Sequence, residues 1–148
     1  MKPAHLAVAA LLLAPAAALA AEPAARHFPV APGPAPANFS AAVQAGNTLY
    51  ISGGIDVDPA TGKPGTDITE AAKNALNGLK KNVEAAGMTM DDLVWVQIFC
   101  SDLSYYGKFN DVYRTYFKGP LPARAFLGVD HLLQGAHFEM MGVAVKAK

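Results

Sequence analysis

The 148-residue sequence has little cysteine, little charge and no net charge of either sign. Its single cysteine, Cys100, excludes a disulfide within the chain and a metal site built from clustered cysteines. Twelve Lys and Arg balance twelve Asp and Glu, and charged residues make up only 16% of the chain. A basic excess is the usual mark of a nucleic-acid-binding domain, so we expect no nucleic-acid partner. The hydrophobic content of 52% argues against intrinsic disorder.

The first 20 residues, MKPAHLAVAALLLAPAAALA, have the three parts of a secretory signal peptide. Lys2 supplies the positive start, residues 6–13 form an unbroken apolar run, and residues 18–20 are a small-residue cleavage site. The alternative is a membrane anchor, but Pro15 interrupts the segment and the run is shorter than the ~18 residues of a span. We therefore predict cleavage after Ala20, a periplasmic or secreted protein, and no membrane association of the mature chain.

Removal of Lys2 leaves 11 basic against 12 acidic residues, so the mature chain has a net charge near −1. Residues 21–37 are rich in Ala and Pro, which is typical of an extended leader or linker. The remaining residues, 38–148, show no repeat and no second change of composition. We expect them to form one domain.

The hydrophobic pattern of the mature chain predicts an α+β fold. A Gly-Asn turn joins two short alternating segments into a hairpin, and Asp67 or Thr69 begins a helix that ends at Ala86, before Gly87. The apolar sequence VWVQIFC predicts a strand covered on both faces, with Val94, Val96, Ile98 and Cys100 sharing one face. The expected strands are 41–45, 48–52, 94–100, 123–129 and 137–145, and the expected helices are 67–86 and 104–117. This order favours a mixed sheet with two helices on one face.

Arg124 is the first candidate functional residue because it lies in an otherwise apolar strand. A guanidinium held at an apolar wall can bind a planar carboxylate through two parallel hydrogen bonds. The alternative is an arginine on an edge strand that reaches solvent or pairs with an acid.

Glu139 is the second candidate, in the middle of the apolar segment Phe138–Met141. A carboxylate there is costly unless it is paired, exposed or functional. Near a bound electrophile, it could position a water molecule and carry its proton. The alternative is a solvent-facing residue of a half-buried strand.

Other patterns point to no chemistry. Asp130 and His131 lack the Gly-x-Ser-x-Gly motif of a triad nucleophile, and the histidines have no metal-ligand spacing. Gly53-Gly54 matches no phosphate-binding loop. Cys100 is expected to be a packed thiol. We expect no metal site.

The chain from Asn38 to Lys148 resembles the RidA family, also called YjgF or endoribonuclease L-PSP. The most specific part of the resemblance is Pro122-Ala123-Arg124 followed by Glu139 fifteen residues after the arginine. The other landmarks are FSAAV at 39–43, LYISG at 49–53, DPATG at 58–62, EAAG at 84–87, Asp102-Leu103, and Phe109-Asn110-x-x-Tyr113 through Phe117.

The resemblance implies a chorismate-mutase-like fold and a homotrimer with active clefts between subunits. It implies hydrolysis of reactive 2-imino acids to 2-keto acids and ammonia without a cofactor. Arg124 would bind the carboxylate of the small substrate and Glu139 would position the attacking water. Ser52 and Asn110 match positions that line the cleft.

Three positions depart from the family pattern. Phe39 stands where the family has a tyrosine, and Phe126 stands where a cysteine is common, so both expected substrate contacts are more apolar here. Gly54 replaces a frequent glutamine. These changes keep an alternative open, a non-enzymatic trimer that binds a small carboxylate or acts like a chaperone. Ribonuclease activity is a third and poorer alternative. Phosphate binding needs Lys and Arg, whereas the mature chain has a net charge near −1 and no cluster of basic residues in its sequence.

Overall fold

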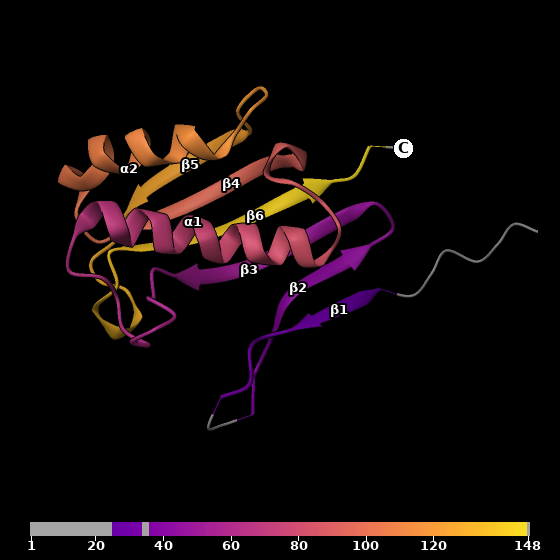
Figure 1. The fold of residues 1–148 in the computed structure, drawn as a ribbon, viewed down its shortest axis with the longest axis horizontal. Helices are drawn as coiled ribbons and strands as arrows, with labels where there is room; N and C mark the ends of the chain where they lie inside the picture. Colours follow the sequence, from indigo (N-terminus) through magenta and orange to yellow (C-terminus); the bar gives the residue numbers. More distant parts are fainter. Residues whose placement is uncertain (1–24, 34–35, 148) are drawn as a thin grey trace, which may run out of the picture.

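A computed structural model describes residues 25–33 and 36–147 (Figure 1). The predicted signal peptide, residues 1–20, lies outside the described residues. In the described part of the chain, six strands form one sheet with the order β1-β2-β3-β6-β4-β5. The strands are β1 (Arg26–Pro29), β2 (Ser40–Ala45), β3 (Thr48–Ile55), β4 (Leu93–Cys100), β5 (Ala123–Gly128) and β6 (Phe138–Val145). Only the β4–β5 pair is parallel, so the predicted mixed sheet is confirmed.

Two α-helices, α1 (Ile68–Ala85) and α2 (Tyr106–Tyr113), lie on the same face of the sheet (Figure 1). The predicted start of α1 is confirmed, since the Asp67 side chain accepts hydrogen bonds from the backbone N–H groups of Thr69 at 2.9 Å and Glu70 at 3.0 Å. Gly87 follows the helix with a φ of +71°, a backbone conformation that favours glycine.

The predicted helix over 104–117 is present in three pieces. The 3₁₀ turns η2 (Leu103–Tyr105) and η3 (Arg114–Tyr116) flank α2, and η1 (Met90–Asp92) and η4 (Leu133–Gly135) are further 3₁₀ turns. The Thr115 hydroxyl donates to the backbone carbonyl of Val112 at 2.7 Å. Such a side-chain bond competes with the regular helical pattern and accompanies the tighter winding at this end.

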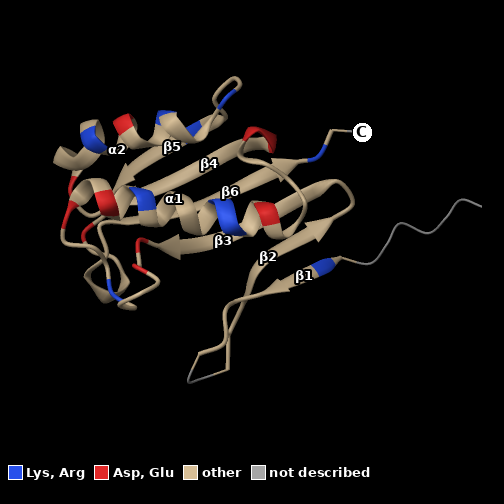
Figure 2. Cartoon of the chain, in the orientation of Figure 1, with Lys and Arg blue, Asp and Glu red and all other residues tan. Residues whose placement is uncertain are grey.

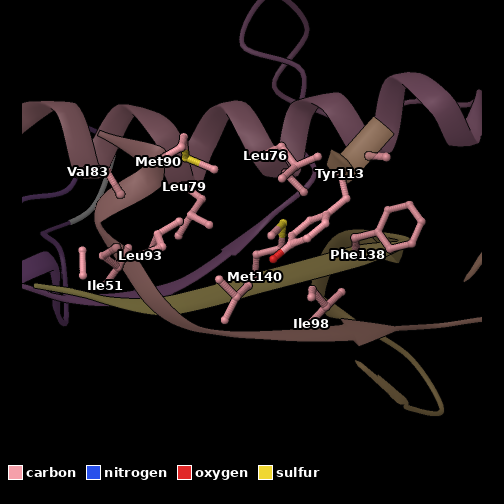
Figure 3. Packing of buried hydrophobic residues seen from close by; sticks show 14 of the residues in the cluster. Ile51, Leu76, Leu79, Val83, Met90, Leu93, Ile98, Tyr113, Phe138 and Met140 are labelled. Atoms are coloured by element: carbon pink, nitrogen blue, oxygen red, sulfur yellow. The ribbon is translucent and has the colours of Figure 1, made fainter. Parts of the chain in front are cut away.

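The core lies between the two helices and the sheet face that they cover (Figure 3). Alternate residues of the central strands point toward the helices, and an apolar stripe of each helix meets them. The largest fully buried side chains include Leu49, Leu76, Val83, Ile98, Phe109, Phe138 and Met140. The opposite face carries no helix in the described residues. For example, Tyr50 on that face is 55% exposed.

The structure corrects two expectations. A register shift between Leu93 and Trp95 takes Val94 out of the buried row, so Val94 is 48% exposed and Leu93 is buried in its place. Part of the expected leader is also a strand of the sheet, because β1 pairs with β2 and buries Phe28. Arg26 lies over the Phe28 ring, with 4.5 Å between the guanidinium carbon and the ring centroid.

Cys100 is a packed thiol, as predicted. It is buried, and its Sγ donates to the backbone carbonyl of Asp102 at 3.0 Å. Burial raises the pKa of this thiol, which keeps it in the unreactive protonated form.

Basic and acidic residues are interspersed along α1 and α2 (Figure 2). Three exposed ion pairs join residues three or four positions apart: Glu70–Lys73 and Lys80–Glu84 in α1, and Asp111 of α2 with Arg114 of η3. In the described ranges, no helix is both long enough and apolar enough to cross a membrane. The same ranges hold no group of three or more His, Cys, Asp or Glu side chains placed to bind a metal ion.

Candidate functional site

Arg124 lies in a small cavity between β5 and α2, which we call the Arg124 cavity. Its Nη1 donates to the side-chain oxygen of Asn110 at 2.8 Å, and its Nη2 donates to the Tyr106 hydroxyl at 3.4 Å. The cavity has a volume of about 170 Å³. Its lining residues are Tyr106, Asn110, Tyr113, Arg114, Leu121, Pro122 and Arg124.

The sheet register explains why Arg124 faces the helices. Arg124 is paired with Val96 of β4, and side chains at paired positions share a face. Val96 is buried beneath the helices, so the guanidinium points toward α2. There it lies over the Tyr113 ring, with 4.8 Å between the guanidinium carbon and the ring centroid. The π-face of an aromatic ring attracts a cation at this distance.

The partners of Arg124 are neutral. Burial raises the pKa of Tyr113 to about 12, against a smaller opposing effect of Arg124, so the phenol is uncharged at neutral pH. Across residues 25–33 and 36–147, no Asp or Glu lies within ion-pair distance of Arg124. Because a guanidinium stays protonated in proteins, its positive charge is free to pair with a carboxylate from outside the chain.

Glu139 lies in a second cavity, the Glu139 cavity, with a volume of about 630 Å³. This cavity opens on the sheet face without helices, because Glu139 pairs with Phe99 of β4 and alternates with the buried Phe138 and Met140. Its lining is largely apolar and consists of Phe39, Ser52, Gly53, Ile55, Leu133, Gln134, Glu139 and Met141. No Lys, Arg or His of the described residues forms an ion pair with Glu139.

A β-bulge in β3 makes room for the Glu139 carboxylate. The register between β3 and β6 shifts between Ile51 and Gly54, so Ser52 and Gly53 together face Met141. A Cβ atom at position 53 would collide with Oε1 of Glu139, whereas one at Gly54 would meet open space. Bulges often re-aim side chains beside active sites, and here the glycine lets the carboxylate lie directly on the β3 backbone.

The six predicted site residues therefore form two groups within one chain. Arg124, Asn110 and Phe126 lie on the helix-covered face. Glu139, Ser52 and Phe39 line or border the other cavity, with Phe39 60% exposed and the Ser52 hydroxyl donating to the Ser40 carbonyl at 2.6 Å. One chain does not bring Arg124 and Glu139 around one cavity.

Phe126 lies beside Arg124, with 5.8 Å between the guanidinium carbon and the ring centroid. Its contact with a substrate stays a prediction. Its ring packs edge-on against Tyr106, with 5.0 Å between centroids, and against Phe109, with 5.4 Å. Phe126 thus supports the side chains around the guanidinium from the core side.

Two residues of the site regions were missed by sequence reasoning. The sequence marks Tyr113 only as one landmark of the family resemblance, although its ring lies against the Arg124 guanidinium. Within the described residues its buried hydroxyl has no hydrogen-bond partner. Asp56 was not considered, yet its side chain is fully buried next to the Glu139 region. An acidic residue directly after an apolar strand was the available signal for Asp56.

Within the described residues, the fold and the two cavities define a single-sheet α+β protein with one guanidinium and one carboxylate that form no ion pair. Residues 30–146 match the family model described as endoribonuclease L-PSP. The chain belongs to this family, which is the RidA or YjgF family.

Relatives and solved structures agree with this assignment. The mouse protein named 2-iminobutanoate/2-iminopropanoate deaminase is 39% identical over 120 residues, covering 80% of this chain and 85% of that protein. A protein of the same name from Dermatophagoides farinae is 38% identical, covering 79% and 91%. The structure of the YjgF gene product of E. coli has a TM-score of 0.72 at 31% identity and covers 82% of this chain and 94% of that chain. The structure of E. coli TdcF with bound serine has the same TM-score at 29% identity and the same coverage.

The two glycines of the bulge region give a matched pair of variants. We expect Gly53→Ala to push the Glu139 carboxylate into another rotamer, because the new Cβ would occupy the position of Oε1. Gly54→Ala should leave Glu139 in place. The free energy of unfolding should change by less than about 1 kcal/mol in both variants, since only the end of a flexible side chain must move. Crystal structures and urea denaturation check this. An unmoved Glu139 carboxylate in Gly53→Ala would contradict it.

Proposed function

We propose that this protein hydrolyses reactive 2-imino acids to 2-keto acids and ammonia. In this proposal, Arg124 binds the substrate carboxylate and Glu139 positions the attacking water. The observation that carries it is the guanidinium of Arg124, held by the neutral side chains of Asn110 and Tyr106 and paired with no acid of the described chain. Support also comes from the relatives named 2-iminobutanoate/2-iminopropanoate deaminase.

The proposed reaction requires the protein to orient the substrate and water and to supply one acid–base group. The carbon of a protonated imine is already electrophilic, so water adds to it once the two are held together. The Glu139 carboxylate would accept a proton from this water as the C–O bond forms, giving a carbinolamine. The protonated Glu139 then returns this proton to the nitrogen. As the C–N bond breaks, the Glu139 carboxylate takes up the hydroxyl proton, so ammonia leaves and the 2-keto acid remains.

The large Glu139 cavity would receive the substrate side chain. Phe39, Ile55, Leu133 and Met141 give it an apolar wall beside the carboxylate. The imino acids that fit best under this proposal carry an uncharged side chain, because a charged one would lose water there without gaining an opposite charge.

We further propose that the active cleft forms between subunits of a homotrimer. Arg124 and Glu139 open on opposite faces of one sheet, so a cleft with both requires two copies of the chain. Apolar side chains on the helix-free face, including Tyr50 and Leu127, are exposed in the single chain. Burial of such a face against other copies is favourable.

Binding without catalysis is the second candidate function. It is favoured by Phe39, which replaces a possible hydroxyl contact by an exposed apolar ring. A carboxylate ligand would then raise the unfolding temperature, and this shift would depend on Arg124 and not on Glu139.

Substitution of the two candidate residues tests the reaction. With 2-iminopropanoate generated in situ by an amino-acid oxidase, Glu139→Gln should lower kcat about 10²- to 10⁴-fold, the usual worth of a positioned acid–base group. In Arg124→Ala, the rate should no longer saturate within the accessible range of substrate concentrations, because the carboxylate has lost its binding partner. Arg124→Lys keeps the positive charge but not the paired donors, so its kcat/KM should lie between those of Arg124→Ala and the wild type. Full activity in Arg124→Ala, or no acceleration over buffer by the wild type, would contradict the proposal.

Mixed assemblies test the intersubunit cleft. If each cleft takes Arg124 from one copy and Glu139 from the next, equal amounts of Arg124→Ala and Glu139→Gln refolded together should recover about one quarter of wild-type activity by random assortment. The control pairs Arg124→Ala with the double variant Arg124→Ala/Glu139→Gln and should stay inactive. No recovery in a verified trimer, by native mass spectrometry, would show that clefts do not form between copies.

We also propose that the protein is exported. The tripartite pattern of residues 1–20 supports this, with cleavage after Ala20. N-terminal sequencing of the protein from the periplasm of an exporting host should begin at Ala21. An intact Met1 in that fraction would contradict cleavage.

A further inference from the structure

The end of β3 needs an additional anchor because it follows a bulge. Before the bulge, β3 and β6 are paired at Ile51 and Gly142. After it, the remaining pairs are Gly54 with Met140 and Ile55 with Glu139. A bulge interrupts the regular hydrogen-bond ladder and increases the local twist. Strand β4 holds the other edge of β6 at Glu139, so this short stretch of pairing is what aligns β3, and with it Gly53, beneath the Glu139 carboxylate.

Asp56, the residue after β3, connects the end of β3 to the start of β6 through hydrogen bonds. Its Oδ1 accepts hydrogen bonds from the backbone N–H groups of His137 at 2.9 Å and Phe138 at 3.2 Å. Its Oδ2 lies 3.1 Å from Nδ1 of His137. The Asp56 backbone N–H also donates to the Phe138 carbonyl at 3.1 Å. All these contacts hold the two residues that immediately precede Glu139.

The geometry around Asp56 permits little movement. The side chain is fully buried, and a buried carboxylate is costly unless hydrogen bonds satisfy its oxygens. Bonds to a carboxylate are roughly twice as strong as those between neutral groups. Nδ1 of His137 lies at hydrogen-bond distance from Oδ2, so the imidazole completes the set of polar contacts around the Asp56 carboxyl group. The imidazole also packs edge-on against Tyr105, with 5.8 Å between ring centroids.

We propose that Asp56 and His137 form a clamp that positions Glu139 for catalysis. The clamp holds the end of β3 against the start of β6, so the carboxylate on β6 keeps its place over Gly53. Both are positioning residues and act through Glu139. The inference rests on the proposed function, since it assigns the clamp to the water-positioning half of the same site.

The clamp should affect kcat more than KM. The Arg124 guanidinium donates its hydrogen bonds to Asn110 and Tyr106 of α2, and none of the hydrogen bonds of Asp56 or His137 involves these residues. Substrate binding through the guanidinium therefore persists when the clamp is lost. Small displacements of a catalytic group lower the rate strongly, and a shift of about 1 Å can lower it 10²-fold.

Four variants test the clamp in the full-length protein. Asp56→Ala should lower kcat about tenfold to a hundredfold with KM nearly unchanged. Asp56→Asn should recover part of the loss, because its amide oxygen still accepts the backbone N–H groups. His137→Phe keeps an aromatic ring beside Tyr105 and removes only the contact between the imidazole and Asp56. Its decrease in kcat should therefore be smaller than that of Asp56→Ala. The control is Asp130→Ala, which breaks the exposed Asp130–His131 pair at 3.0 Å and should behave as the wild type.

Hydrogen exchange supplies the second measurement. In Asp56→Ala and His137→Phe, the amides of Phe138 and Glu139 should exchange at least about tenfold faster while those of α1 keep their protection, which distinguishes local loosening from global unfolding. If Asp56→Ala does not fold, His137→Phe and Asp56→Asn carry the test. Unchanged kcat in both, or equal losses in Asp130→Ala, would overturn the clamp. Absence of imine hydrolysis in the wild type would instead refute the proposed function.

Discussion

The organisation of this protein depends on a sheet that helices cover on one face only. Side chains alternate between the faces of a strand, so every residue of β5 and β6 belongs either to the helix-covered core or to the open face. Arg124 falls on the first and Glu139 on the second. A guanidinium held by neutral partners and a carboxylate resting on a glycine are thereby kept apart within one chain. Neither neutralises the other, and both remain available to an external ligand.

The two cavities use different means to hold a charge. At Arg124, a flat aromatic ring and two neutral oxygen acceptors support a permanent cation without cancelling it. At Glu139, the support is backbone geometry: a bulge, a missing Cβ at Gly53 and a buried acid at the end of the strand. The first arrangement is set by side chains of one helix. The second needs an accurate alignment of two strands far apart in the sequence.

This difference explains which features could be predicted from the sequence. The hairpin, the start of α1 at Asp67 and the candidates Arg124 and Glu139 depend on nearby residues or on unusual residue types within an apolar strand. The exposure of Val94 and the opening for Glu139 depend on register shifts, which arise only when strands pair. The role of Asp56 depends on partners 81 and 82 residues away. Strand β1 is not evident from the sequence, because four residues that end in Pro29 carry too short a pattern to indicate a strand.

The position of β6 has a consequence for folding. This last strand lies between β3 and β4 and joins them into one sheet. Until it is in place, the chain holds two separate groups of strands, each with an unpaired edge able to pair with another chain. Closure across such long separations is slow, because loop entropy is lost before contacts are gained. The strand that carries Glu139 is therefore also the strand that joins these two groups into one sheet.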